Sequence, residues 1–207
     1  MKREEKNLIS RRKILNSAFK EFGENGYGLS SINNICTAGD ISKGILYHYF
    51  KDKDELYLEC IKALFDSLTL HLQNELSNIS GTNESRLERY FDARLSFFRE
   101  NPLFQKLFCD VIIAPPTHLV QAISKAKVSF DTLNISVLTE LLQSAKIRSD
   151  VTIQTAVETF RLYQDFINAR YQMNSPEAFD LEKHEKICKR SLSILLYGVI
   201  ERDGNLQ

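Results

Sequence analysis

Glycine, proline and tryptophan are scarce in this chain of 207 residues, which has eight glycines, four prolines and no tryptophan. Between Ile45 and Tyr197 the only glycine is Gly81. Sandwiches, barrels and doubly wound sheets need many tight turns, and those turns use both glycine and proline. The scarcity argues against these folds and predicts an all-α protein.

The chain also lacks a charge excess, paired cysteines and long apolar runs. Lys and Arg total 27, as do Asp and Glu, so the whole molecule is not an electrostatic binder of nucleic acid. The four cysteines form no C-x-x-C pair, which is typical of reduced, buried thiols. No apolar run approaches the roughly 18 residues of a membrane span, and the charged N-terminus has no apolar signal core. We therefore expect a soluble, cytoplasmic protein with no membrane partner.

Four helices are predicted in the first third of the chain. An apolar stripe from Ile14 to Phe22, with Ser10 as cap and Gly26 just past the end, predicts the first. Two short helices should follow, over 31–38 with Ser30 or Ser31 as cap, and over 42–50 with Ser42 as cap. Asp52 should then cap a helix that runs to about residue 79.

The helix start and stop signals in the rest of the chain predict five more helices and no strand. They should run over 83–101, from Asn101-Pro102 to Pro115-Pro116, over 117–146, from Ser149 or Asp150 to about residue 173, and beyond Ser175-Pro176 to about residue 202. The expected total is about nine helices.

The two short helices behind a longer first helix have the arrangement of a DNA-binding helix-turn-helix. Leu46 and Phe50, four residues apart, can anchor the second short helix. Its other sides are then free to enter a DNA groove. The segment 1–20 has seven Lys or Arg against two Glu, which gives the local positive charge that the whole chain lacks.

The stretch SSINNICTAGDISKGILYHYFKDKDEL, from Ser30 to Leu56, resembles the DNA-binding signature of the TetR family of transcriptional repressors. The preceding FGENGY is similar to the family's Phe-x-x-x-Gly-Tyr, so the resemblance covers about residues 10–58. One departure is Asp40, which stands where many members have glycine, with Gly39 one position earlier. Because Asp tolerates a left-handed backbone, we expect a slightly altered turn and an intact motif.

The resemblance implies an N-terminal three-helix helix-turn-helix domain over 1–53 that binds double-stranded operator DNA. Lys43, Gly44 and His48 are the candidates for base contacts, with Asn33 from the preceding helix. Phosphate contacts are expected among the rest of the set, which is Ser30, Ser31, Ser42, Tyr47, Tyr49, Lys51 and Lys53. Purely structural roles stay open: Tyr47 and His48 could pack between helices, and Lys51 and Lys53 could be a solvated face.

The resemblance also implies a larger helical domain over 54–207 that binds a small-molecule effector and forms a homodimer through its last two helices. Ten of the thirteen Phe lie in it, enough to line a cavity between helices or simply to fill a core. The expected ligand-binding residues are Phe91, Arg94, Phe98, Phe108, Cys109, Phe130, Asn134, Phe160 and Gln164. Apolar surface for the dimer is expected from Val157, Phe160, Ile167, Ile187, Leu192, Leu195, Leu196 and Val199, some of which could be internal core.

Nothing in the sequence indicates catalysis, a metal site or a cofactor. The four histidines have no metal-ligand spacing, and there is no glycine-rich phosphate loop or nucleophile elbow. We therefore expect a ligand-responsive repressor that binds a palindromic operator as a dimer and is released by a mainly apolar ligand. An activator, a regulator that answers to a protein partner, or a helical enzyme or metal carrier are the alternatives.

Overall fold

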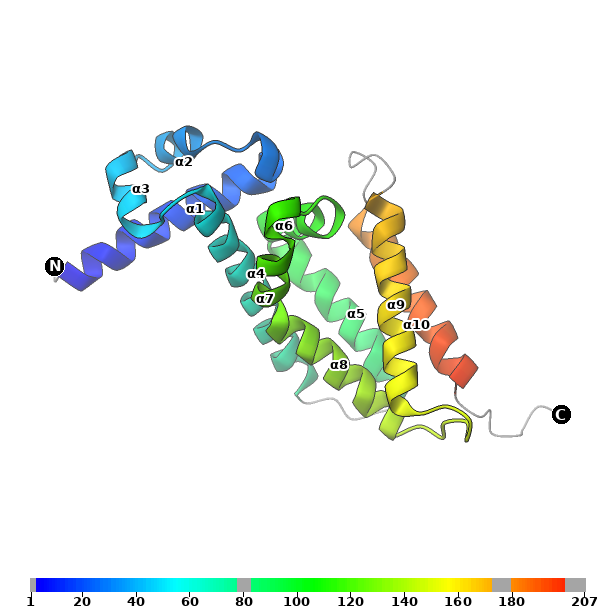
Figure 1. Cartoon of the computed structure of the whole chain (residues 1–207). Coiled ribbons are helices and arrows are strands. Elements are labelled where there is room, and N and C mark those ends of the chain that lie inside the picture. The colour runs from blue at the N-terminus through cyan, green and yellow to red at the C-terminus, as the bar shows by residue number, and fades with distance from the viewer. Residues whose placement is uncertain (1–2, 78–82, 173–179, 200–207) are drawn as a thin grey trace. The chain divides into compact units, whose positions relative to one another are not determined.

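A computed structural model describes residues 3–77, 83–172 and 180–199. These residues form ten α-helices and one short 3-10 helix, with no strand among them. Figure 1 shows the elements in chain order: α1 (Arg3–Leu29), α2 (Ile32–Ala38), α3 (Lys43–Tyr49), α4 (Lys53–Leu76), α5 (Asn83–Glu100), α6 (Pro102–Ile113), η1 (Thr117–Leu119), α7 (Val120–Ala126), α8 (Val128–Gln143), α9 (Ile153–Gln172) and α10 (Leu181–Val199). The expected all-α class is confirmed.

The chain divides into two compact units. The first contains residues 1–67 and 98–128, and the second contains 68–97 and 129–207. In the first, α2 and α3 pack on α1, and α6 packs along α1. In the second, α9 and α10 pack on each other. The functional division into 1–53 and 54–207 remains a prediction.

Local hydrogen bonds explain where the short helices begin. The Ser31 hydroxyl accepts from the Asn33 amide at 3.1 Å, and the Ser42 hydroxyl accepts from the Ile45 amide at 3.2 Å. Each hydroxyl satisfies an amide that the first helical turn leaves without a partner. The Asp52 carboxylate accepts from the Glu55 amide at 2.9 Å in the same way. All three predicted caps are confirmed.

Three helix boundaries differ from the prediction. The first helix is already formed at Arg3, and Ser10 lies inside it, because the residues before Ser10 include good helix formers. The single helix expected over 117–146 is divided into η1, α7 and α8, with a break at Lys127 that nothing in the sequence marks. α9 is capped by Thr152, whose hydroxyl accepts from the Thr155 amide at 3.0 Å, while Asp150 pairs with Arg148.

The count of about nine helices was therefore low. The expected ends near residues 79 and 202 and the Ser175-Pro176 start lie outside the described residues. In the part of the chain that the structure describes, no single helix is both long and apolar enough to cross a membrane. Pro102–Ile113 and Thr117–Ala126 pass that test only when taken together, and they are bent by 92°. By length and composition alone, such a pair is weak evidence of a span.

Candidate nucleic-acid interface and interior cavity

The helix α3 is held by few apolar side chains and presents the rest to solvent. Leu46 is fully buried and Phe50, directly after the helix, is 3% exposed. Lys43, Gly44, Tyr47 and His48 are all exposed. Because their spacing is one and four residues, they share one face of the helix. α3 therefore offers a continuous polar face, as a helix that enters a DNA groove must.

An open hollow of about 570 Å³ lies between α2 and α3. Its lining joins exposed polar residues of both helices with the turn between them: Asn33, Thr37, Asp40, Ser42 and Lys43, with Cys36 and Ile41. Asn33, Ser42 and Lys43 were predicted to lie at the DNA, so the fold places these three beside one another.

The residues predicted to contact phosphate differ in their surroundings. Lys51 is exposed, and Ser31 and Tyr49 are partly exposed, with the Tyr49 hydroxyl donating to the Asn7 amide oxygen at 3.0 Å. Lys53 is half-buried, with its ammonium 4.3 Å from the centre of the Tyr27 ring, and burial lowers its pKa. Ser30 is 6% exposed, and its hydroxyl faces the Gly26 and Glu21 carbonyls, to either of which it can donate its one hydrogen. This burial argues against a phosphate contact by Ser30.

Glu21, which the sequence reasoning missed, ties α1 to the start of α2. Its carboxylate accepts from the Ser31 amide and from the Asn34 side-chain amide, both at 2.9 Å, and the residue is 9% exposed. Hydrogen bonds to a charged group stabilise more than neutral ones. The carboxylate thus fixes the helix-turn-helix on α1. In the sequence, a glutamate one residue before the buried Phe22 was the available signal for such a structural carboxylate.

A second polar cluster joins α1, α4, α6 and η1 within the first unit. Tyr27 donates to Asp54, and His118 Nε2 lies 3.2 Å from the other Asp54 oxygen. The hydrogen bond from Tyr27, with His118 beside it, holds the pKa of Asp54 below its ordinary value. Tyr57 donates to Asp110 at 3.0 Å, and burial raises the pKa of Asp110. These contacts connect the Gly-Tyr end of α1 to the first turn of α4.

The second unit encloses a small cavity between α5, α8, α9 and α10. Its volume is about 20 Å³, room for about one water. Five of the predicted ligand-binding residues line it: Phe91, Arg94, Asn134, Phe160 and Gln164. Phe130 adjoins the group, with its ring 5.5 Å from the Arg94 guanidinium. The fold therefore gathers six of the nine predicted residues.

The other three predicted ligand-binding residues lie in the first unit. Phe98 and Phe108 are about 1% exposed, with ring centroids 4.7 Å apart and ring planes tilted by 46°. The Phe108 ring also lies against Phe65, edge to face. Cys109 is partly exposed on the same helix as Phe108. Phe98 and Phe108 are core residues here, because aromatic residues at helical spacing serve a core as readily as a cavity.

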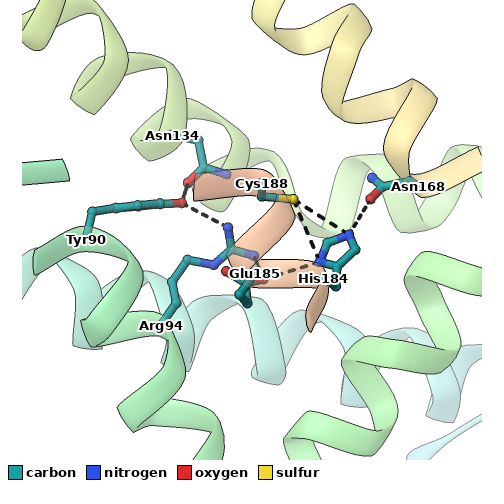
Figure 2. Close-up of polar contacts among 7 residues, drawn as sticks. All are labelled: Tyr90, Arg94, Asn134, Asn168, His184, Glu185 and Cys188. Atoms are coloured by element: carbon teal, nitrogen blue, oxygen red, sulfur yellow. Dashed lines mark hydrogen bonds and ion pairs between the residues drawn. The ribbon is translucent and has the colours of Figure 1, made fainter. Parts of the chain in front are cut away.

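A buried ion pair beside the cavity was not anticipated (Figure 2). Arg94 Nη2 lies 3.0 Å from Glu185 Oε1, and both side chains are almost fully buried. Burial alone would lower the pKa of Arg94, but Glu185 and Tyr90 outweigh it and raise that pKa above its ordinary value. Cys188 lies one turn from Glu185 on α10, and burial raises the pKa of its thiol to about 12. Glu185 on the apolar stripe Leu181–Cys188–Leu192 was the signal that a buried charge is present.

Comparison with known proteins identifies the helix-turn-helix. The sequence profile described as "Bacterial regulatory proteins, tetR family" matches residues 14–60, which span α1, α2, α3 and the start of α4. Over these residues the chain is similar to the N-terminal region of TetR-family regulators.

Curated relatives match over less than half of the chain. The chain is 30% identical over 88 residues to the biofilm operon icaADBC HTH-type negative transcriptional regulator IcaR of Staphylococcus aureus, covering 42% of this chain and 43% of IcaR. It is 29% identical over 70 residues to the HTH-type transcriptional regulator HbdR of Aromatoleum sp., covering 34% of this chain and 31% of HbdR. The chain thus spans less than half the length of these curated relatives.

Solved structures extend the TetR likeness in fold to most of the chain. FadR from Bacillus subtilis, solved in complex with stearoyl-CoA, aligns with a TM-score of 0.68 at 18% identity, covering 91% of this chain and 99% of FadR. A tetR family regulator from Shewanella sp. PV-4 aligns with a TM-score of 0.65 at 17% identity, over 93% and 99% of the two chains. At this identity the likeness shows the fold alone.

The turn that departs from the usual TetR pattern is intact. Asp40 has φ of 48°, the only positive φ at a non-glycine residue in the described ranges, and the Ile41 amide still donates to the Cys36 carbonyl at 2.9 Å. A Cβ at Gly39 would lie 2.5 Å from the Ser17 hydroxyl. A side chain at position 39 would thus require Ser17 and Ile41 to shift. Asp40 supplies the left-handed residue, as predicted from its tolerance of that conformation.

Proposed function

We propose that this protein is a TetR-family transcriptional repressor that binds double-stranded operator DNA as a homodimer and is released by a small-molecule effector. The exposed polar face of α3 is the observation that carries the DNA-binding part. Lys43, Gly44 and His48 would meet base edges in the major groove, because they share the solvent face. Asn33 would reach a base from α2.

Phosphate contacts would position the protein on the duplex without reading its sequence. Ser31, Ser42, Tyr47, Tyr49, Lys51 and Lys53 are the proposed donors. Tyr47 is 51% exposed, so its side chain is open to solvent. Ser30 is left out of this set because its hydroxyl is already buried against backbone carbonyls.

Exposed apolar side chains on α9 and α10 support a homodimer through these two helices. Leu162, Phe166 and Ile194 are 71%, 61% and 62% exposed. Such side chains on neighbouring helices favour a partner surface, and a two-fold dimer would supply it. Of the residues expected there from sequence, Ile167, Leu192 and Leu196 are instead buried inside the second unit.

An effector would bind in the second unit and act through α4. This helix begins at Lys53, shortly after α3 ends at Tyr49, and continues without interruption to Leu76. A change in α4 would therefore shift the recognition helices away from the spacing of one DNA turn. An effector with about a 100-fold preference for the DNA-incompetent state corresponds to roughly 2.7 kcal/mol of coupling.

Three alternatives remain beside this proposal. An activator uses the same DNA-binding surface, and a protein partner in place of an effector would suit the small size of the cavity. A helical enzyme or metal carrier has no support from the comparisons, in which the relatives are transcriptional regulators. A repressor is preferred because IcaR is a negative regulator. A cytoplasmic location would follow from action on DNA in a bacterial cell.

Light scattering on the full chain and on Phe166→Asp tests the assembly. We expect a dimer for the native chain, and a monomer for Phe166→Asp because a carboxylate would be buried in the apolar interface. Gln154→Asp, which adds the same charge at an exposed position on α9, is the matched control and should stay dimeric. A monomeric native chain that still binds DNA at micromolar concentration would contradict the homodimer.

A further inference from the structure

The cavity of the second unit has one charged wall. Arg94 lines it beside Tyr90, Asn134 and Gln164, whereas Glu185, the ion-pair partner of Arg94, does not line it. A molecule entering the cavity therefore meets the guanidinium before the carboxylate. This order favours a ligand that carries an anion over one that carries a cation.

Glu185 is a weakly matched partner for Arg94 (Figure 2). Arg94 and Glu185 are 2% and 1% exposed, and one oxygen of the carboxylate lies 3.0 Å from Nη2. In the described part of the chain, neither Glu185 oxygen accepts a hydrogen bond. The strong arginine–carboxylate pairs are bidentate, with two parallel hydrogen bonds. A carboxylate on a ligand could therefore bind this guanidinium better than Glu185 does.

The rest of the cavity wall is apolar and leads to a second cavity. The first one is also lined by Leu87, Phe91, Val137, Leu141 and Cys188. The second cavity, also of about 20 Å³, is lined by Leu142, Ala156, Leu195 and Leu196 and by one polar residue, Thr159. The two cavities share Leu138, Phe160 and Leu192 as walls. A ligand with its head at Arg94 would thus extend its tail along apolar side chains. Each cavity is smaller than an alkyl chain, so binding would require the shared side chains to move apart.

We propose that the effector is an amphipathic monocarboxylate, whose carboxylate binds Arg94 in place of Glu185 and whose apolar chain lies between α8, α9 and α10. This inference rests on the proposed ligand-responsive function and names the chemical class of its effector. Arg94 can neutralise only one carboxylate. His184 Nδ1 lies 3.5 Å from Glu185 Oε1 (Figure 2), but a neutral imidazole adds no positive charge, so beside it a second buried anion would be left uncompensated. The ligand must therefore displace Glu185, which lies on α10.

Isothermal titration of the full-length chain with decanoate, decanol and decylamine tests the class of ligand. These probes share a ten-carbon chain and differ in the charge of the head group. Decanoate should bind roughly ten- to a hundredfold tighter than decanol, the range expected for hydrogen bonds to a charged group. Tighter binding of decylamine than of decanoate would overturn the proposal, because Glu185 would then be the recognition group.

Variants of the ion pair test the exchange. Glu185→Gln should bind decanoate about tenfold tighter than the native chain and decanol equally well, because the competing anion is gone. Arg94→Gln leaves a buried carboxylate unpaired and can unfold the chain, so the decisive variant is the double Arg94→Gln/Glu185→Gln, which removes both charges. The double variant should bind decanoate no better than decanol. Arg99→Gln, at an exposed arginine on the same helix, should keep the native preference.

Two further results would contradict the exchange: weaker decanoate binding by Glu185→Gln, or a decanoate preference that survives in the double variant. DNA binding by the ligand-free protein is measured in parallel. If the protein binds DNA but not decanoate, the proposed class of effector is wrong and the proposed function still stands. Absence of DNA binding overturns the proposed function.

Discussion

The glycine of the Phe-x-x-x-Gly-Tyr motif should be the least replaceable glycine of the first unit. Gly26 has φ of 64° and ψ of 174° and forms the kink near the end of α1. This backbone region is essentially restricted to glycine and costs other residues about 1–3 kcal/mol. A Cβ at this position would also lie 2.8 Å from Asp110 Oδ1. That carboxylate cannot retreat freely, because it holds the Tyr57 hydroxyl at 3.0 Å and the Tyr27 amide at 3.4 Å.

Gly26→Ala should therefore lower the free energy of unfolding by about 3 kcal/mol, as the sum of backbone strain and roughly 1 kcal/mol for a weakened hydrogen bond. For a chain of about this size, the melting temperature should fall by roughly 6–12 °C. Thermal unfolding followed by circular dichroism measures the shift.

Gly28→Ala is the matched control. Gly28 has no positive φ, and a Cβ there meets nothing within 4 Å. Alanine should be neutral or stabilise the helix by up to about 1 kcal/mol. The double variant Gly26→Ala/Asp110→Ala separates backbone strain from the contact with Asp110. Compared with Asp110→Ala alone, it should lose only the stability that the backbone strain costs. If Gly26→Ala melts within 1 °C of Gly28→Ala, the reasoning from backbone and contact is refuted.

Three other substitutions probe the first unit. Glu21→Ala should destabilise the chain by about 2–3 kcal/mol and weaken DNA binding, since the Ser31 amide and the Asn34 side chain lose their charged acceptor. Glu21→Gln keeps one acceptor oxygen, so its free energy of unfolding in urea should fall by less. Asp54→Asn should destabilise the chain at pH 7, and this effect should shrink as pH falls. The reason is that a carboxyl with a lowered folded pKa contributes stability above its unfolded pKa of about 3.9 and loses it as pH falls through the folded pKa; a destabilisation that does not change with pH would contradict this. Lys53→Ala should reduce the salt slope of DNA binding by about 0.9 per subunit, whereas Lys62→Ala, farther along α4 and paired with Asp66, should leave it unchanged; an unaltered slope for Lys53→Ala would make Lys53 a partner of Tyr27 only.

Local chemistry made the helix-turn-helix predictable. Ser31, Ser42 and Asp52 cap their helices through hydrogen bonds to amides two or three residues away, so the sequence neighbourhood contains both partners. Leu46 and Phe50 are buried because their four-residue spacing places them on one side of the chain. Such short-range signals need no knowledge of the tertiary fold.

The interior of the second unit was less predictable, because its polar contacts join residues far apart in the chain. Arg94 was expected to orient a ligand, yet its pairing with Glu185 connects α5 to α10 across about ninety residues. Phe98 and Phe108 have the same aromatic character as Phe91 and Phe160, and only the fold separates core from cavity. In the first unit, the break at Lys127 was likewise unpredictable, because no cap or helix-breaking residue marks it.

Selection of duplex DNA from a random library by the full-length chain, followed by sequencing, tests the central claim most directly. A homodimer with one α3 per half-site should enrich a pseudo-palindrome whose half-sites are centred about 10 base pairs, or one helical turn, apart. Lys43→Ala should change the enriched half-site, because a base contact specifies sequence at roughly 1–3 kcal/mol. No enriched sequence, or enrichment of isolated half-sites only, would contradict a dimeric operator-binding regulator.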